Sequence, residues 1–292
     1  MPAVFVLIWS TGFIVAKFGL PFAPPLTFLA MRYALSIFCF LIWIRFSRAR
    51  WPQGRQQWLH LAVTGVLMHA GYLGGVWVAV KGGMGSGLAA LVVGLQPVLT
   101  ALWVSWAGLS GDSATEHKVS PRQWMGLVLG LGGLLLVVAR KFGTGSEVTL
   151  LTLGCTVFAL LSITVGTLYQ KKHGGAADLR TGSLIQFAAS FVVVLPVALV
   201  LESTPVDYTA EFWGALAWSV LALSIVAITL LLVMIRRGRA TEVASLMYLT
   251  PPTTALFAWL LFGEQLGALA WTGVVVTMAG VALVLKSGKK NA

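Results

Sequence analysis

The side chains best suited to chemistry in this sequence are a few polar groups inside long apolar runs. Arg32 lies about two helical turns from the end of one run, and His69 lies near the middle of the next, three residues before Tyr72. A guanidinium can bind a substrate carboxylate, whereas an imidazole can exchange a proton near neutral pH. Both His69 and Tyr72 would share one helical face. All three are candidate cavity-lining residues, although the pattern favours a structural, snorkelling arginine, and His69 could also be a packing residue.

Several aromatic and helix-breaking residues occupy the same kind of position. Trp9, Trp77 and Tyr248 could form an aromatic substrate pocket. Considered one at a time, each of them is explained at least as well by packing against lipid. Gln96 and Pro97 stand near the middle of one run, and the pair Pro251-Pro252 stands near the middle of another. A proline inside a helix removes a hydrogen bond and bends the helix. We expect Gln96 to line the cavity, and the prolines to be fixed kinks that shape it rather than moving hinges.

Other kinds of chemistry find no support in the residue types. No apolar run carries an Asp or Glu near its centre, so a carboxylate proton relay is not expected. Cys39 and Cys155 both lie inside apolar runs, and their spacing indicates neither a metal site nor a disulfide. The sequence also lacks a phosphate-binding glycine loop with its lysine, and a nucleophile with a neighbouring base. We therefore expect no enzyme activity, no cofactor, no metal and no direct use of ATP.

The elements that position these residues must lie in a lipid bilayer. Of 292 residues, 58% are apolar and only 10% are charged, whereas soluble domains carry about 25% charged residues. The mean hydropathy is +0.89. The formal net charge of +11 comes from Lys and Arg residues in the connections between apolar runs, which indicates membrane topology rather than nucleic-acid binding.

Ten apolar runs have a length suited to membrane-spanning helices. The expected spans are 3–20, 24–46, 57–80, 84–109, 121–140, 149–171, 181–201, 210–235, 241–263 and 267–286. If the N-terminus is cytoplasmic, the inner connections and the C-terminal tail hold 15 Lys and Arg residues and the outer connections hold four. This asymmetry predicts that both termini face the cytoplasm.

The two halves of the chain match each other in register. An offset of 154 residues aligns Gly12 with Gly166, Lys17 with Lys171, Pro97 with Pro251, and Thr100-Ala101-Leu102 with Thr254-Ala255-Leu256. After an insertion in the first half the offset becomes 147, which aligns Trp124 with Trp271 and Gly126 with Gly273. Each half would contain five spans, an odd number, so the second half is predicted to enter the membrane from the opposite side. Inverted repeats of this kind are typical of secondary transporters.

Two stretches of the sequence resemble the EamA domains of the drug/metabolite transporter superfamily. The first is Trp9-Ser10-Thr11-Gly12-Phe13-Ile14-Val15-Ala16-Lys17, followed one span later by Arg32; the second is Leu260-Leu261-Phe262-Gly263-Glu264-Gln265-Leu266. The resemblance covers the whole chain as two tandem domains. It implies a ten-helix inverted-repeat fold and export of small metabolites, with bacterial inner-membrane exporters of amino acids as the most similar members and the aromatic amino-acid exporters as one candidate group among them. The Gly-Glu pair has no counterpart in the first half, where Gly108-Leu109-Ser110 stands.

These observations predict an all-α polytopic membrane protein with ten transmembrane helices in two inverted five-helix repeats, residues 1–142 and 147–288. The expected function is export of small amphipathic metabolites, foremost neutral or aromatic amino acids, across the bacterial inner membrane by alternating access. An uncoupled facilitator, a broad-specificity drug or metabolite exporter, and a membrane scaffold or channel subunit are the alternatives. The expected partners are a small-molecule substrate and the lipid bilayer, without nucleic acid. The sequence leaves open whether the protein forms a homodimer.

Overall fold

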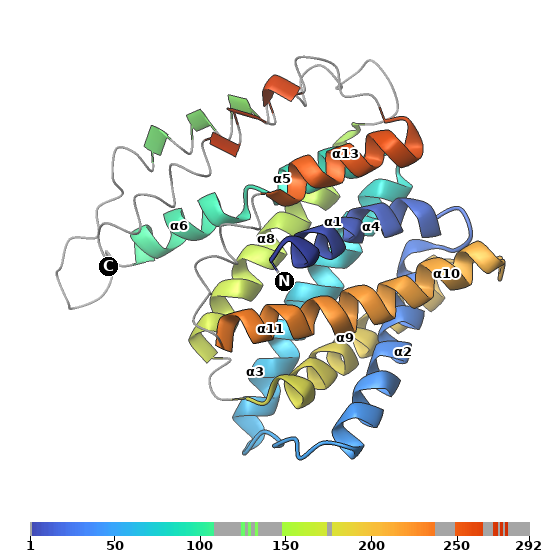
Figure 1. Cartoon of the computed structure of the whole chain (residues 1–292), viewed down its shortest axis with the longest axis vertical. Helices are drawn as coiled ribbons and strands as arrows, with labels where there is room; N and C mark the ends of the chain where they lie inside the picture. Colours follow the sequence, from blue (N-terminus) through green and yellow to red (C-terminus); the bar gives the residue numbers. More distant parts are fainter. Residues whose placement is uncertain are drawn as a thin grey trace.

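The fold is known from a computed structural model, which describes residues 2–107, 148–173, 177–236 and 249–264. Short helical pieces at 124–125, 128–129, 132–133, 271–273, 275–276 and 278–279 are described as well. The regular structure in these ranges is helical, without strands (Figure 1). The predicted spans 121–140 and 267–286 fall largely outside the described residues, as does Tyr248. The count of ten helices therefore stays a prediction.

The described helices follow the predicted apolar runs closely. They are α1 (Pro2–Gly19), α2 (Pro25–Arg45), α3 (Arg55–Gly65), η1 (Val66–Gly71), α4 (Tyr72–Lys81), α5 (Ser86–Val93), α6 (Gln96–Ala107), α8 (Leu150–His173), α9 (Leu179–Leu201), α10 (Ala210–Trp218), η3 (Ser219–Ala227), α11 (Ile228–Arg236) and α13 (Thr250–Phe262). The series α3–η1–α4 and α10–η3–α11 each run without interruption. Five helical stretches are long and apolar enough to cross a membrane: Pro25–Arg45, Arg55–Lys81, Leu150–His173, Leu179–Leu201 and Ala210–Leu230.

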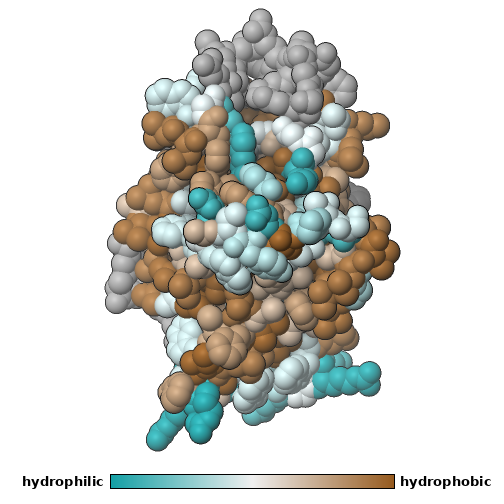
Figure 2. All heavy atoms as spheres, turned by 90° about the vertical axis from the view of Figure 1, so that its right-hand side faces the viewer, coloured by the Kyte–Doolittle hydropathy of each residue, from teal (hydrophilic) through white to brown (hydrophobic). Residues whose placement is uncertain are grey.

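The outer surface of the bundle is suited to lipid. Large apolar side chains are exposed along α8 and α9, for example Phe158 at 56%, Leu199 at 75% and Val200 at 81%. Figure 2 shows a broad hydrophobic surface between a polar patch near the middle of the view and polar side chains at its lower end. A soluble protein rarely exposes so large a continuous apolar area, so this surface supports a polytopic membrane protein.

Local sequence signals define several helix ends. α2 begins directly after Pro24, with Pro25 in its first turn, where a proline loses no helical hydrogen bond. The hydroxyl of Thr209 accepts from the backbone N–H of Phe212 at 3.2 Å and caps α10. α13 ends at Gly263, whose φ of 64° lies in the left-handed region that favours glycine.

Asp178 caps α9 and joins this helix to the connection after α2. Its Oδ1 accepts from the backbone N–H of Arg180 at 3.0 Å, and the Arg180 guanidinium donates to both carboxylate oxygens at 2.9 and 2.6 Å. Its Oδ2 also accepts from the backbone N–H of Arg50 at 3.4 Å. The Arg180 hydrogen bond lowers the pKa of Asp178 to about 2. The capping carboxylate is thus held in its charged form.

We expect Asp178→Asn to lower the stability of the protein near neutral pH by up to about 1 kcal/mol, because asparagine can still cap the helix but loses the charge that pairs with Arg180. Because the folded-state pKa is depressed, the carboxylate stabilises the fold above its unfolded pKa, and this contribution is lost as the pH falls from about 4 towards 2. Thermal unfolding in detergent between pH 7 and pH 2 measures both effects. The two melting curves should converge at the acid end; a constant difference down to pH 2 would contradict the prediction.

α2 and α9, which the 154-residue offset relates, pack against each other in opposite directions. At one end of the α2–α9 pair, the backbone N–H groups of Leu26 and Thr27 donate to Glu202 at 2.8 and 2.7 Å. At the other end, the contact between Arg50 and Asp178 joins the chain after α2 to the start of α9. α5 and α13, which the offset does not relate, are also antiparallel, because Ser86 at the start of α5 contacts Glu264 just after α13. Both pairs are therefore antiparallel.

Two π-helical segments occupy matching positions in the two halves. η1 covers Val66–Gly71 and η3 covers Ser219–Ala227, and an offset of 154 residues carries the whole of η1 into η3. π-helical turns are rare and are frequent at functional sites. The hydropathy of the sequence contains no sign of either segment.

Glycines allow the halves to approach closely at two places. A Cβ atom built on Gly65 would lie within 2.7 Å of three backbone atoms of Gln186 in α9. On Gly75 it would lie 2.6 Å from the carbonyl oxygen of Cys155 in α8. Small residues at such crossings let helix backbones pack directly in a membrane.

Candidate functional site

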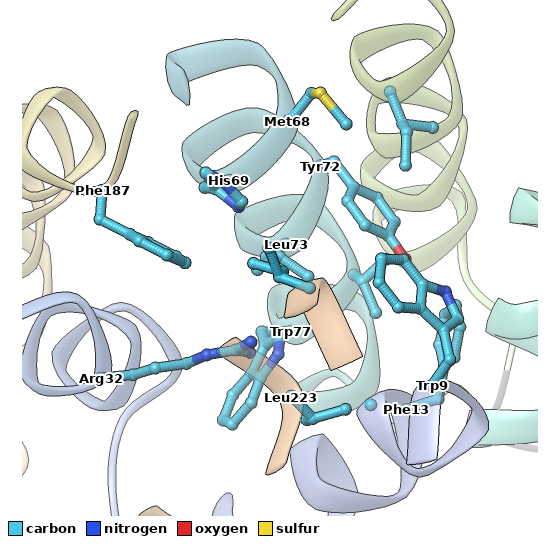
Figure 3. Close-up of a pocket in the computed structure, with 14 residues that line it drawn as sticks. Trp9, Phe13, Arg32, Met68, His69, Tyr72, Leu73, Trp77, Phe187 and Leu223 are labelled. Atoms are coloured by element: carbon cyan, nitrogen blue, oxygen red, sulfur yellow. The ribbon is translucent and has the colours of Figure 1, made fainter. Parts of the chain in front are cut away.

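A cavity lies at the centre of the bundle, between helices of both halves. It is lined from the first half by α1, α2, η1 and α4, and from the second half by α8, α9, η3 and α11. Its volume is about 90 Å³, which is enough for several water molecules or a small solute. Trp9, Arg32, His69, Tyr72 and Trp77 all line this cavity (Figure 3). Five of the seven candidate residues from the sequence thus meet at one place.

Arg32 supplies a positive charge to the cavity wall. The side chain points inward from α2 (Figure 3), and the residue is only 6% exposed, so it does not snorkel to the surface. Its Nε donates to the hydroxyl of Ser224 at 3.2 Å. The ion pairs of the described residues are Lys17 with Glu264 and Arg180 with Asp178, so no described carboxylate neutralises Arg32.

His69 and Tyr72 form the polar part of the opposite wall. The His69 ring is stacked on Phe187 of α9, with ring centroids 4.5 Å apart and an angle of 21° between the planes. Tyr72 follows at the start of α4, and its side chain points towards Trp9 in the close-up view (Figure 3). Together with Phe13 and Trp77 these rings make the interior largely aromatic. Such a wall suits a flat or apolar part of a ligand.

Side-chain hydroxyls bind backbone carbonyls in both π-helical segments. Tyr33 of α2 donates to the carbonyl oxygen of His69 at 2.9 Å. Ser224 donates to the carbonyl oxygen of Ser219 at 3.2 Å while it accepts from Arg32. The irregular backbone therefore has its own partners beside the cavity, as it must at membrane depth.

Buried aromatic rings pack beside the cavity at one of its ends, where Trp77 lines it. The Trp77 ring is tilted against Phe28 of α2, with centroids 4.6 Å apart, and Phe28 makes an edge contact with Phe212 of α10 at 5.6 Å. Each of these three residues is at most 1% exposed. We call them the aromatic plug. Phe28 and Trp77 belong to the first half and Phe212 to the second, so the plug joins the halves.

An ion pair lies at the same end of the bundle as the aromatic plug. Lys17, near the end of α1, donates to Oε1 of Glu264 at 2.6 Å. The same oxygen accepts from the backbone N–H and the hydroxyl of Ser86, both at 3.2 Å. This Lys17–Glu264–Ser86 cluster also connects the two halves. The backbone N–H of Asp207 adds a further connection at this end, because it donates to the carbonyl of Phe22 at 2.7 Å.

The remaining sequence candidates lie outside this cavity. Gln96 Nε2 donates to the hydroxyl of Thr167 at 3.0 Å and joins α6 to α8 instead of lining the cavity. Pro97 stands in the first turn of α6, and Pro251 and Pro252 stand in the first turn of α13. The interruption of the fourth predicted span falls at Gly94 and Leu95, before the proline. Each of these prolines therefore stands in the first turn of a described helix, where a missing N–H is tolerated, and Pro97 does not kink a continuous helix.

Several residues of the site did not stand out in the sequence. Phe187, Phe28 and Phe212 are three of fifteen phenylalanines, all compatible with ordinary packing. Ser224 could have been found as a hydroxyl inside an apolar run, but many such serines only bond their own helix. Its contact with Arg32 joins residues 192 positions apart in the chain.

A helical bundle of membrane-spanning segments around a solute-sized cavity defines a polytopic membrane protein with an internal cavity. The model of the EamA-like transporter family matches residues 3–139 and 150–286. The chain therefore belongs to this family, within the drug/metabolite transporter superfamily, and contains two tandem EamA regions.

Relatives of similar length have names that indicate transport. The chain is 25% identical to the "Uncharacterized transporter sll0355" of Synechocystis, over 95% of this chain and 86% of that protein. It is 26% identical to the "Uncharacterized inner membrane transporter YedA" of Escherichia coli K12, over 95% and 87%. It is 24% identical to the "Probable amino-acid metabolite efflux pump" of the same strain, over 94% and 90%. These names, like that of the family, indicate a transporter rather than an enzyme.

A solved crystal structure has the same fold. It superposes with a TM-score of 0.63 at 16% identity and covers 97% of this chain and 95% of its own. This similarity extends over both halves of the chain.

Proposed function

We propose that this protein is a secondary transporter that moves small amphipathic metabolites through the central cavity by alternating access. The proposal rests on two observations. Residues of both halves line the cavity, and contacts between the halves lie at one of its ends. The antiparallel packing of α2 against its offset-related helix α9 and the matching π-helical segments support two inverted five-helix repeats, residues 1–142 and 147–288. Inverted repeats that rock about a central site are a known basis of alternating access.

The proposed substrates are small amphipathic metabolites, with neutral and aromatic amino acids as the first candidates, and the proposed direction is export across the inner membrane. The aromatic lining supports a partly apolar cargo, and the name of the Escherichia coli relative points to amino-acid metabolites. The excess of basic residues in alternate connections supports cytoplasmic termini. In that orientation the aromatic plug and the Lys17–Glu264–Ser86 cluster close the periplasmic end.

Opening of the closed end would require the halves to separate there. The aromatic plug and the Lys17–Glu264–Ser86 cluster would both come apart, because each contains residues of both halves. Access from the other end would then have to close. The substrate would cross the membrane without a continuous channel.

Filling the cavity tests this proposal. Gly12 lines the cavity, and a Cβ atom built on it would have its nearest neighbour at 3.9 Å, on the Leu223 side chain. Gly12→Leu should therefore fold and occupy the space, and we expect counterflow of phenylalanine or leucine in proteoliposomes to fall about tenfold or more, the equivalent of about 1.4 kcal/mol. Gly154→Leu in α8 is the matched control, because nothing lies within 4 Å of that position.

The control should transport like the original protein. Equal flux through Gly12→Leu and the original protein would exclude the cavity as the route. Absence of any saturable flux in the original protein, across a panel of amino acids and small carboxylic acids, would contradict the transport proposal itself.

An uncoupled facilitator is the second candidate, because the described cavity lining contains no Asp or Glu that could carry a coupling proton. His69 is the one imidazole in that lining. Counterflow that stays unchanged after collapse of the proton gradient would favour the facilitator. Flux that depends on the gradient, and loses this dependence in His69→Gln, would favour proton coupling.

A further inference from the structure

The cavity wall holds a buried positive charge without a negative partner among the described residues. Arg32 is 6% exposed and lines the cavity. Its one described hydrogen-bond partner, the Ser224 hydroxyl, is neutral. A charge within a membrane is costly and is normally paired. Binding of an anion beside Arg32 would remove this imbalance, so the cavity is suited to a carboxylate.

Two neutral hydroxyl groups are buried in the segments that carry Arg32 and its partner Ser224, outside the cavity lining. Ser36 lies one helical turn after Arg32 on α2. Ser219 and Ser224 both belong to η3 and are five residues apart. Ser36 and Ser219 are fully buried, and neither hydroxyl has a hydrogen-bond partner within the described part of the chain. Hydroxyls can donate to an anion, but they cannot neutralise Arg32.

The same lining offers no negative charge to an ammonium group among its described residues. It contains no carboxylate among the described residues. The carbonyl oxygens of His69 and Ser219, in the two π-helical segments, already accept from Tyr33 and Ser224. An α-ammonium group would also lie near Arg32 whenever the carboxylate of the same molecule binds it, and like charges repel strongly where water is scarce.

We propose that the cavity recognises a monocarboxylate with an aromatic or aliphatic body through Arg32, and that it does not recognise an α-amino group. The inference rests on the proposed function and deepens it, since it names the part of an amphipathic metabolite that the site binds. Its basis is the juxtaposition of one unneutralised guanidinium with a wall of aromatic rings. The ligand class comprises arylalkanoates, branched-chain acids and 2-oxo acids, and an amino acid would bind through its carboxylate alone.

A set of ligands that share one phenyl group tests this recognition on the purified full chain. The ligands are 3-phenylpropionate, its neutral amide 3-phenylpropanamide, L-phenylalanine and 2-phenylethylamine, and binding is followed by quenching of tryptophan fluorescence and by calorimetry. We expect 3-phenylpropionate to bind about tenfold or more tighter than the amide and at least as tightly as phenylalanine, and 2-phenylethylamine not to compete. Tighter binding of phenylalanine than of 3-phenylpropionate by tenfold, or competition by the amine, would overturn the proposal.

Two variants assign the preference to Arg32. In Arg32→Gln the preference for the acid over the amide should vanish, while Arg32→Lys should keep a reduced preference because the charge remains. The ligand-free Arg32→Gln protein should melt at or above the temperature of the original protein, because it no longer buries an unneutralised charge. A lower melting temperature would assign Arg32 a structural role, and so would an unchanged preference for the acid. Either result would contradict the proposal.

Transport measurements separate this inference from the proposed function. Binding of 3-phenylpropionate without any counterflow would contradict the transport proposal and leave carboxylate recognition standing. Counterflow of phenylalanine that 3-phenylpropionate fails to inhibit would contradict carboxylate recognition and leave the transport proposal standing.

Discussion

Glu264→Gln is expected to shift the protein towards a conformation that is open at the Lys17 end. Glu264 accepts hydrogen bonds from Lys17 Nζ at 2.6 Å and from the backbone and hydroxyl of Ser86 at 3.2 Å. Glutamine keeps the size of the side chain and loses the charge that strengthens these bonds. Hydrogen bonds to charged groups contribute about 1.5–3 kcal/mol. Because the Lys17 side chain is 35% exposed, solvent screening reduces this to about 1–2 kcal/mol, or a fivefold to thirtyfold change in population.

Distance measurements between spin labels can detect this shift. Phe18 near the end of α1 and Leu261 near the end of α13 are 45% and 63% exposed, so both positions should accept a label without disturbing the packing. The background would carry Cys39→Ala and Cys155→Ala, since both native cysteines are free thiols. In Glu264→Gln we expect a second, longer distance to gain population.

Asp178→Asn is the matched control for this experiment. It also removes the charge of a paired carboxylate, but from the Asp178–Arg180 pair at the start of α9, which lies at the opposite end of the bundle. It should leave the 18–261 distance distribution unchanged. An equal response to both substitutions, or no response to Glu264→Gln, would show that the Lys17–Glu264–Ser86 cluster does not hold this end closed.

Gly65→Leu is expected to have the largest effect on stability. The residue lies where α3 crosses α9, and a Cβ atom there would overlap the backbone of Gln186. A backbone cannot move aside as a flexible side chain can, so the two helices would have to separate. We expect Gly65→Ala to cost about 2–3 kcal/mol and Gly65→Leu to exceed about 4 kcal/mol, a rare value for one substitution.

Thermal unfolding and size-exclusion profiles in detergent measure this effect. Gly154→Ala and Gly154→Leu serve as controls, because Gly154 is exposed on α8 with no atom within 4 Å of its would-be Cβ. Neither control should lose stability, and both should gain up to about 1 kcal/mol because alanine and leucine have a higher helix propensity than glycine. Normal stability of Gly65→Leu would mean that α3 and α9 do not cross at this distance.

Much of the candidate site could be predicted because polar and charged groups are costly inside a bilayer. Arg32 and His69 stood out for that reason, and Tyr72 was included through its helical spacing from His69. The structure brings these residues together with Trp9 and Trp77 at one cavity. Gln96 met the same criterion, yet it pairs with Thr167. The type of residue indicated that each polar group needs a partner, but it could not indicate whether that partner is a ligand or another helix.

By itself, the sequence determined the helical membrane class, the positions of the described spans and the relation between the two halves. These properties depend on local hydropathy and on residues that recur at a constant offset, and both can be read directly from the amino-acid sequence. The tertiary structure alone decided which residues meet across the halves. Lys17 pairs with Glu264 over 247 positions, and the π-helical segments turn Ser224 towards Arg32. Such contacts depend on how helices rotate and cross, and close backbone packing at residues such as Gly65 sets that geometry.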